Sequence, residues 1–187
     1  MKILVACERS GKVRRAFNTL GHLCFSCDLV PADDGETRFH LQGDVREYFK
    51  YPWDMMIAFP PCTHLCVSGA KHFKTKRALG LQQQAIAFFM DVVKAPIRRI
   101  AVENPVGIMS TIFRQPDQII QPWQFGHGET KATCLWLKNL PLLETRVISE
   151  GRVDRIHKMA PSENRGVLRS ITYDGVADAM SLQWGSL

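Results

Sequence analysis

A cysteine that directly follows two prolines is the residue in this sequence best suited to covalent chemistry. Cys62 comes after Pro60 and Pro61, which fix the backbone and prevent a helix from starting there. A thiol on such a rigid loop can act as a nucleophile if its surroundings favour the thiolate, and His64 and Lys71 are near in sequence. A structural cysteine would more usually lie inside a strand. The pattern therefore predicts a nucleophile.

An acidic group follows a second apolar run. Glu103, Asn104 and Pro105 come directly after the predicted strand 99–102, in which residues 100–102 are apolar. Partial burial raises a carboxyl pKa, so a glutamate at this place could donate a proton near neutral pH. Taken alone, the glutamate could equally be a surface charge. Paired with the Pro-Pro-Cys motif, it is predicted to be a catalytic acid on a loop braced by Asn104 and Pro105.

Short apolar runs alternate with helical patterns, which predicts an α/β fold with a mostly parallel sheet. The predicted strands are residues 3–7, 22–27, a short run before Gly43, 54–58, 99–102, 118–121, 134–137 and 146–149. The predicted helices are residues 13–20, 75–94 and 176–184, and the predicted loops include residues 30–37 and 152–169. The last helix is expected to pack in the core rather than in a cleft.

Polar groups stand where the first strands end. Ser10 and Gly11 follow the first strand, Asp28 ends the second, and Asp44 follows the third. Ligands of open α/β sheets bind at the carboxyl ends of the strands, so these groups and the two motifs predict one cleft. Asp28 is placed to accept from ribose hydroxyls. Asp44 could accept from an amino group of a cofactor base or cap the next helix.

The first turn is not a phosphate-binding loop of the G-x-G-x-x-G type, because Gly11 is its only glycine. A nucleoside cofactor without a pyrophosphate would not require the backbone of this turn to approach it so closely. The six cysteines include a C-x-x-C pair, Cys24 and Cys27, but a zinc site needs a second pair at comparable spacing. Buried small side chains are the simpler interpretation, and no metal is predicted.

The chain of 187 residues is long enough for one domain with a core, and its composition is that of an ordinary globular protein. The net charge of +6 suits a polyanion such as nucleic acid, although many proteins are mildly basic. The sequence contains no apolar run long enough to span a membrane, and its first apolar run is too short for a signal peptide. A cytoplasmic location without membrane contact is predicted.

The motifs together resemble those of the DNA (cytosine-5)-methyltransferases. The resemblance is carried, in chain order, by Ser10-Gly11, Asp28, Gly43-Asp44, Pro61-Cys62 and Glu103-Asn104. The family has a Pro-Cys loop followed downstream by Glu-Asn-Val, and the stretch 125–136 looks like its Lys-x-Thr-x-x-Trp segment. Over residues 1 to about 137 the resemblance implies a Rossmann-like, class I S-adenosylmethionine-dependent methyltransferase fold. Such a fold has a mostly parallel central sheet with helices on both faces.

The resemblance implies methylation of cytosine C5 in DNA. The Cys62 thiolate would add to C6 and Glu103 would protonate or hydrogen-bond N3, with Asn104 beside them. C5 would then take the methyl group of S-adenosylmethionine, on a base that is flipped out or already unpaired. The residues expected to bind S-adenosylmethionine are Ala6, Cys7, Glu8, Ser10, Gly11, Asp28, Leu29, Asp44, Val45 and Pro60. The residues expected to bind the substrate are Pro61, Thr63, Lys131, Thr133 and Arg146.

The chain is too short to carry the target-recognition domain usual in that family. We therefore expect residues 1–187 to form a single methyltransferase-like domain, in which residues 138–172 are a reduced or missing target-recognition region. Basic residues in this stretch could hold phosphates. DNA, duplex or single-stranded, is the predicted partner, and a protein partner could supply specificity. So small an enzyme would suit a phage or other mobile element.

Two other functions stay open. The same thiol addition could modify a pyrimidine in RNA or in a free nucleotide. Alternatively, the loss of glycines around Gly11 is consistent with a catalytically degenerate methyltransferase fold that binds nucleic acid or protein. The presence of both Cys62 and Glu103 favours an enzyme.

Overall fold

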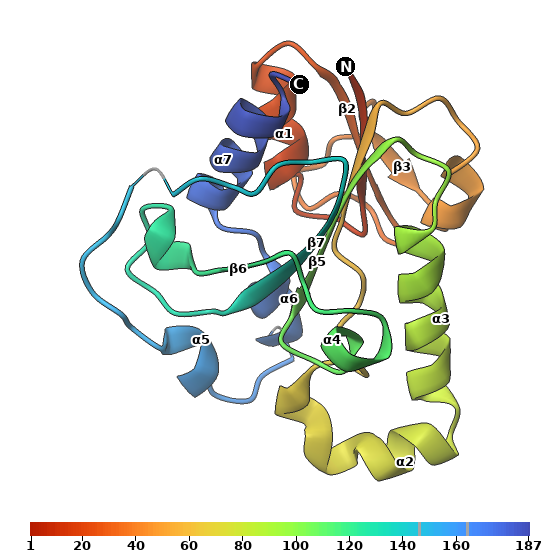
Figure 1. The fold of residues 1–187 in the computed structure, drawn as a ribbon, viewed down its shortest axis with the longest axis vertical. Helices are drawn as coiled ribbons and strands as arrows, with labels where there is room; N and C mark the ends of the chain where they lie inside the picture. Colours follow the sequence, from red (N-terminus) through yellow and green to blue (C-terminus); the bar gives the residue numbers. More distant parts are fainter. Residues whose placement is uncertain (146, 164) are drawn as a thin grey trace.

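Seven strands form one sheet in the order β3-β2-β1-β4-β5-β7-β6 (Figure 1). The computed structural model describes residues 1–145, 147–163 and 165–187. The strands are β1 (Lys2–Ala6), β2 (Leu23–Asp28), β3 (His40–Gln42), β4 (Met55–Ala58), β5 (Arg99–Pro105), β6 (Gln118–Ile120) and β7 (Thr133–Lys138). β7 runs antiparallel to β5 and β6, and the strands from β3 to β5 pair in parallel. The sheet is therefore mostly parallel, as predicted.

Helices lie on both faces of the sheet. The α-helices are α1 (Lys12–Thr19), α2 (Phe73–Ala78), α3 (Leu81–Val93), α4 (Met109–Ile112), α5 (Arg155–Lys158), α6 (Arg165–Ser170) and α7 (Asp174–Trp184). Short 3-10 helices are η1 (Val45–Tyr48), η2 (Val67–His72) and η3 (Pro122–Gln124). None of the helices in the described chain has the length and apolar character that a bilayer crossing requires.

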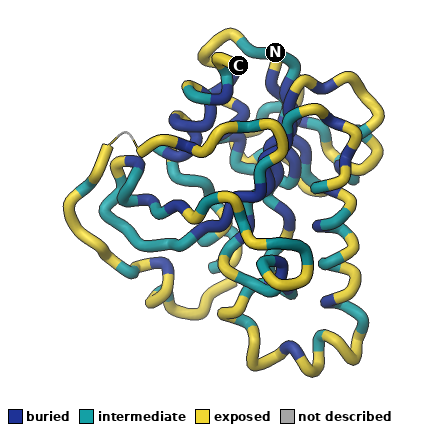
Figure 2. The backbone as a smooth tube through the Cα atoms, viewed as in Figure 1, coloured by how far each residue is buried: buried dark blue, intermediate teal, exposed yellow. Residues whose placement is uncertain are grey.

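The alternation of side chains along β1 explains why both faces of the sheet are covered. Ile3 and Val5 join an apolar cluster with residues of α1 and α7, whereas Leu4 and Ala6 join a second cluster with residues of α3. All four side chains are fully buried, and the central strands are the darkest part of Figure 2. Parallel strands covered in this way bring their carboxyl ends to one edge of the sheet.

Three sequence predictions about the elements are wrong. The helix predicted over residues 75–94 is two helices, because Gly80 has a φ of 69° and starts α3 after α2 has ended. The described part of the predicted strand 146–149 makes only an isolated bridge, between Val147 and Phe125. The predicted loop 152–169 contains α5 and most of α6. By contrast, α7 buries Ala177, Met180 and Trp184 in the core, as predicted.

Candidate active site

A cavity of about 710 Å³ opens where β1, β2, β4 and β5 end. This volume lies in the range of roughly 300 to 1,000 Å³ that is usual for small-molecule sites. The strand-end residues that line the cavity are Cys7, Glu8, Ser10, Asp28, Pro60, Pro61, Cys62, Thr63 and Glu103. Lys131, which precedes β7, lines it too. Four strand ends thus share one cleft.

A buried amide connects the Pro-Pro-Cys loop to the end of β5. The Nδ2 atom of Asn104 donates to the Pro60 carbonyl at 2.7 Å, and Asn104 is only 1% exposed. Cys62 is two residues beyond Pro60, and Glu103 directly precedes Asn104. The contact therefore fixes the thiol loop and the carboxyl loop relative to each other.

Backbone pairing continues this connection beyond the two motifs. The Val67 amide donates to the Val106 carbonyl at 3.1 Å, and the Ile108 amide donates to the Leu65 carbonyl at 3.0 Å. Between them, Gly107 lies so close to the Leu65 carbonyl that a β-carbon could not fit. We refer to residues 65–67 and 106–108, paired in this way, as the loop zipper.

Cys62 and Glu103 influence each other electrostatically across the cavity. Burial raises the pKa of the Cys62 thiol, and Cys66 and Glu103 raise it further, whereas Lys131 lowers it. Burial also raises the pKa of the Glu103 carboxyl, against the opposing effects of Lys131 and the Thr133 hydroxyl. Cys62 is only partly buried and is open to the cavity. The site therefore pairs a reachable thiol with a carboxyl whose pKa is raised by burial, and one cation, Lys131, acts on both.

The first turn of the cleft is organised by a buried carboxylate. The Val13 and Arg14 amides donate to the two oxygens of Glu8, at 2.7 and 3.2 Å, and so cap the start of α1. An internal carboxylate thus occupies the place where a ligand phosphate would bind in a glycine-rich loop. Asp28 and Asp33 line the same end of the cavity. Arg9 lines this end too and pairs with Asp33, so Asp28 is the carboxylate best placed to meet a positively charged ligand.

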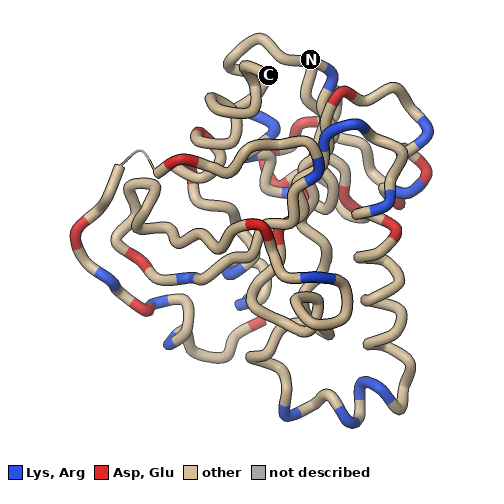
Figure 3. The backbone as a smooth tube through the Cα atoms, viewed as in Figure 1, with Lys and Arg blue, Asp and Glu red and all other residues tan. Residues whose placement is uncertain are grey.

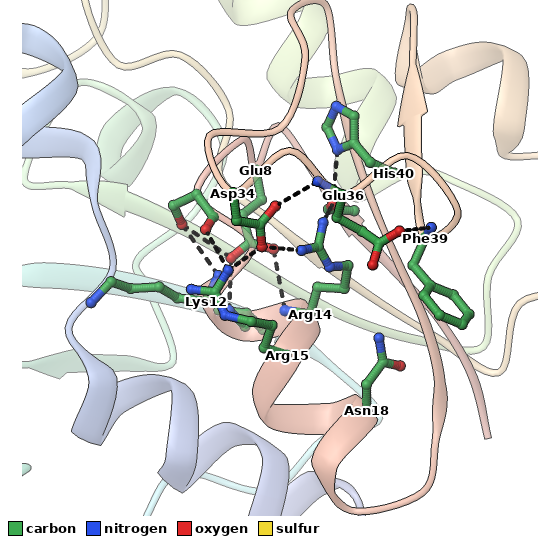
Figure 4. A network of polar contacts seen from close by, with 12 residues as sticks. Glu8, Lys12, Arg14, Arg15, Asn18, Asp34, Glu36, Phe39 and His40 are labelled. Atoms are coloured by element: carbon green, nitrogen blue, oxygen red, sulfur yellow. Dashed lines mark hydrogen bonds and ion pairs between the residues drawn. The ribbon is translucent and has the colours of Figure 1, made fainter.

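A network of charges lies beneath this turn (Figure 4). The Arg14 guanidinium, 2% exposed, donates to Ser26 at 3.0 Å and pairs with Asp34. Gly11 has a φ of 67°, and a β-carbon there would lie 2.5 Å from the Arg14 guanidinium and 2.6 Å from the Asp34 carboxylate. Gly11 does not line the cavity. Its left-handed backbone and the close approach of Arg14 and Asp34 both favour glycine at this position.

Several residues expected to bind ligands lie outside the cavity lining. Asp44 accepts a hydrogen bond from the Arg46 amide at 2.9 Å and pairs with the Arg46 guanidinium. These are the contacts expected of a residue that caps the next helix, which here is η1. Val45 and Ala6 are buried in the core, and Leu29 is 72% exposed. Thr133 lines a small cavity of about 30 Å³ that shares Glu103 and Lys131 with the main one. Arg146 lies outside the described residues.

Sequence comparison finds no relatives, whereas structural comparison does. No protein-family model matches the chain, and no curated protein matches it. A solved structure from an E. coli prophage, provisionally named a DNA modification methyltransferase, matches with a TM-score of 0.54 and 15% identity. The match covers 86% of this chain and 55% of the prophage protein, so the chain spans about half of that protein's length.

The chain has a methyltransferase fold. The structural match and the sheet, with its reversed strand β7, confirm the fold class predicted from the sequence. The cavity opens at the carboxyl ends of the parallel strands, which is the ligand-binding edge of α/β sheets. At 15% identity the match concerns the fold alone.

One side of the cleft was anticipated only in part, because the sequence suggested phosphate contacts for the basic residues of this region but not its place along the cavity. It is lined by Ile156, His157, Gly166, Val167, Arg169, Ser170, Ile171 and Thr172, a stretch with no periodic apolar pattern. We call residues 155–163 and 165–173 the cleft wall. Lys76, from α2, also lines the cavity. It belongs to the segment 67–80, which holds several Lys and Arg residues and no acidic residue (Figure 3).

Proposed function

We propose that this protein methylates cytosine C5 in DNA, through a covalent bond between Cys62 and the base. The observation that carries the proposal is that Cys62 and Glu103 line one cavity on loops fixed to each other by Asn104 and the loop zipper. The fold shared with the prophage protein supports a methyltransferase, and the name of that protein supports DNA as the substrate.

In this proposal, the Cys62 sulfur forms a bond to C6 of the cytosine ring. Glu103 donates a proton or hydrogen bond to N3, so that negative charge does not build up on the ring. Lys131 favours the thiolate, because its charge lowers the pKa of Cys62. S-adenosylmethionine, when bound, supplies the methyl group for C5. Water takes the C5 proton, the bond between Cys62 and C6 breaks so that the sulfur leaves as the thiolate, and a proton placed on N3 returns to Glu103.

The residues at the first turn fit S-adenosylmethionine. The molecule carries a sulfonium and an ammonium group but no phosphate. Asp28 offers a carboxylate to that end of the cavity, where Arg9 and Asp33 pair with each other and Glu8 already occupies the start of α1. Asp28 follows β2, where nucleotide-binding folds place a carboxylate on ribose hydroxyls. We propose that Cys7, Glu8, Ser10 and Asp28 hold S-adenosylmethionine.

Positive charge near the cavity supports a nucleic-acid substrate. Lys76, Lys131 and Arg169 line the cavity, and the segment 67–80 adds further basic residues beside the thiol loop. Such a distribution suits a phosphate backbone, to which lysine and arginine contribute sequence-independent affinity. The target base would have to leave the helical stack to reach Cys62.

The direct experiment offers labelled S-adenosylmethionine together with duplex DNA, single-stranded DNA, RNA or dCMP. We expect label at cytosine C5 in DNA. DNA containing 5-fluorocytosine should form a denaturation-resistant adduct, because fluorine cannot leave C5 as a proton does. Transfer to RNA or dCMP instead would assign the alternative pyrimidine substrates.

Two cysteine variants make the experiment specific. Cys62→Ala should abolish both transfer and adduct formation. Cys66→Ala is the matched control, because Cys66 lines the same cavity four residues away, and this variant should still form the adduct. Binding of S-adenosylmethionine and DNA by the unmodified protein without any transfer would contradict the proposal and favour a binding module.

A further inference from the structure

The cleft wall has little core of its own to hold it in place. Of its described residues, Ile156 alone is buried, and the others are exposed or partly exposed. The wall nevertheless supplies many of the side chains that line the cavity. In Figure 1 the wall starts at α5 and reaches α7 by way of α6. Its position must therefore depend on contacts at its ends.

A single carboxylate contacts both ends of the wall. Glu129 accepts from Nε and Nη2 of Arg155, at distances from 2.8 to 3.0 Å, where the wall begins. The same carboxylate accepts from the Tyr173 hydroxyl at 2.7 Å, where the wall ends. Only 21% of the Glu129 side chain is exposed. The hydroxyl and the guanidinium also hold the pKa of Glu129 below its ordinary value, although burial opposes them.

Backbone contacts add to this anchor at the first end. The Val153 amide donates to the Gly128 carbonyl at 2.9 Å, and the Thr130 amide donates to the Val153 carbonyl at 2.9 Å. The loop that carries Glu129 is thus paired to the chain just before the wall. At the second end, the Tyr173 hydroxyl and its ring make the corresponding contacts.

The same loop places the cation of the active site. Lys131 is two residues beyond Glu129, and its ammonium lies 5.8 Å from the centre of the Tyr173 ring. Lys131 also acts on the pKa values of Cys62 and Glu103. The ring of Tyr173 therefore joins the wall to the group that tunes the proposed catalytic pair.

We propose that Glu129 is a positioning residue, which clamps both ends of the cleft wall and so sets how the substrate is held. The proposal rests on the proposed function above. The wall offers His157, Arg169 and the hydroxyls of Ser170 and Thr172 to the cavity, a set that suits the polar and anionic parts of a nucleotide next to the target base. With the clamp released, these groups lose their fixed positions while Cys62 and Glu103 keep theirs.

The test compares Glu129→Ala with Glu129→Gln, Arg155→Ala and Tyr173→Phe. Loss of the clamp should raise KM for DNA about tenfold in Glu129→Ala, with kcat changed less than about threefold, because substrate contacts are lost and the reacting groups stay in place. The other three variants keep part of the clamp and should give smaller increases. Affinity for S-adenosylmethionine should not change. Glu163→Ala, which removes an exposed carboxylate from the wall itself, should behave like the unmodified protein.

A second readout does not depend on methyl transfer. Trypsin should cut Glu129→Ala within the wall, after Lys158, Arg165 or Arg169, at least several times faster than it cuts the unmodified protein. Unchanged KM and unchanged cleavage in Glu129→Ala would overturn the proposal. So would an equal loss of kcat, cofactor affinity and thermal stability, which would mark Glu129 as a general structural residue. If the unmodified protein transfers no methyl group, the proposed function fails, and cleavage together with Kd for fluorescent DNA still decides the clamp.

Discussion

The two ends of the cleft are fixed by different means. At the thiol end, the loops that carry Cys62 and Glu103 are joined by the Asn104 amide and by the backbone pairing of the loop zipper. At the first turn, charged side chains hold the backbone in place: Glu8 caps α1, and Arg14 pairs with Asp34 beneath the turn. Backbone pairing does not change with pH, whereas a carboxylate contact disappears when the carboxylate is protonated.

Because of this difference, we expect substitutions at the two ends of the cleft to affect different properties of the protein. Substitutions at the thiol end should act mainly on the rate, because the zipper sets where two reacting groups lie. Substitutions beneath the first turn should act mainly on the free energy of unfolding, because a charge would be left buried without its partner. The predictions below test this separation.

The largest expected effect is that of Glu103→Gln. Glutamine keeps the size of the side chain but cannot donate an acidic proton, and general acid catalysis contributes about 10² to 10⁴ in rate. We expect kcat to fall by that factor in a methyl-transfer assay, with the thermal unfolding midpoint nearly unchanged. Retention of kcat within about threefold would remove Glu103 from the mechanism.

The next effect is that of Gly107→Ala. The added β-carbon would meet the Leu65 carbonyl and push the two loops apart. A displacement of about 1 Å between reacting groups can lower a rate about 100-fold, and we expect a loss of roughly 10- to 100-fold in kcat.

Gly80→Ala is the control for that experiment. Gly80 has a φ of 69° at the junction of α2 and α3, and a β-carbon there would meet no atom within 4 Å. Strain in this conformation costs alanine about 1 to 2 kcal/mol, so stability should fall while kcat holds. Equal kcat in the two variants would show that the zipper does not position the thiol.

The sequence predicted the thiol end better than the first turn. Pro61, Cys62 and Glu103 could be singled out because their types and their places after apolar runs are local features, and the structure places them at one cavity. The parallel sheet followed from the alternation of apolar runs and helical patterns. Gly11 was singled out as part of a ligand-binding turn, and the structure adds a second reason for glycine there, the nearby Arg14–Asp34 pair, which joins residues 20 apart in the chain.

The cleft wall illustrates the same limit. Its residues have no apolar period, and contacts with residues far away in the chain, among them those of Arg155 and Tyr173 with Glu129, hold its two ends. Long-range pairing of this kind leaves no signal in a local pattern. The break at Gly80 was missed because a single glycine inside a helical pattern is often tolerated.

The Arg14–Asp34 pair predicts a stability effect of intermediate size. Asp34→Asn leaves the buried Arg14 without its counter-charge, and we expect a loss of about 2 kcal/mol in the free energy of unfolding. This is below the roughly 3 to 5 kcal/mol of fully buried pairs, because 25% of the Asp34 side chain is exposed. Asp33→Asn, which breaks the more exposed pair with Arg9, should cost less than about 1 kcal/mol.

The stabilisation by the Arg14–Asp34 pair should depend on pH in a defined direction. Burial tends to raise the pKa of Asp34, but the Glu36 amide, Arg14 and Arg15 together hold it below the ordinary value of 3.8. The stabilisation is therefore complete above pH 3.8 and is lost as the pH falls through the lower, folded-state value. Urea unfolding should show that the difference in free energy of unfolding between the unmodified protein and Asp34→Asn becomes smaller under acidic conditions. If this difference did not change with pH, the ion pair could not be the source of the stabilisation.

Lys131→Met should produce the smallest effect, a shift in pH dependence. Lys131 lowers the pKa of both Cys62 and Glu103, so its removal should raise both. If the reaction needs the Cys62 thiolate and the protonated Glu103, the kcat/KM profile is bell-shaped, and its two limbs report apparent pKa values that belong to the pair. Both limbs should therefore move to higher pH. Lys74→Met removes the same charge from the exposed side of α2 and should leave both limbs in place. If only one limb moved, Lys131 would lower the pKa of only one of the two groups, and the idea that it acts on both Cys62 and Glu103 would be wrong.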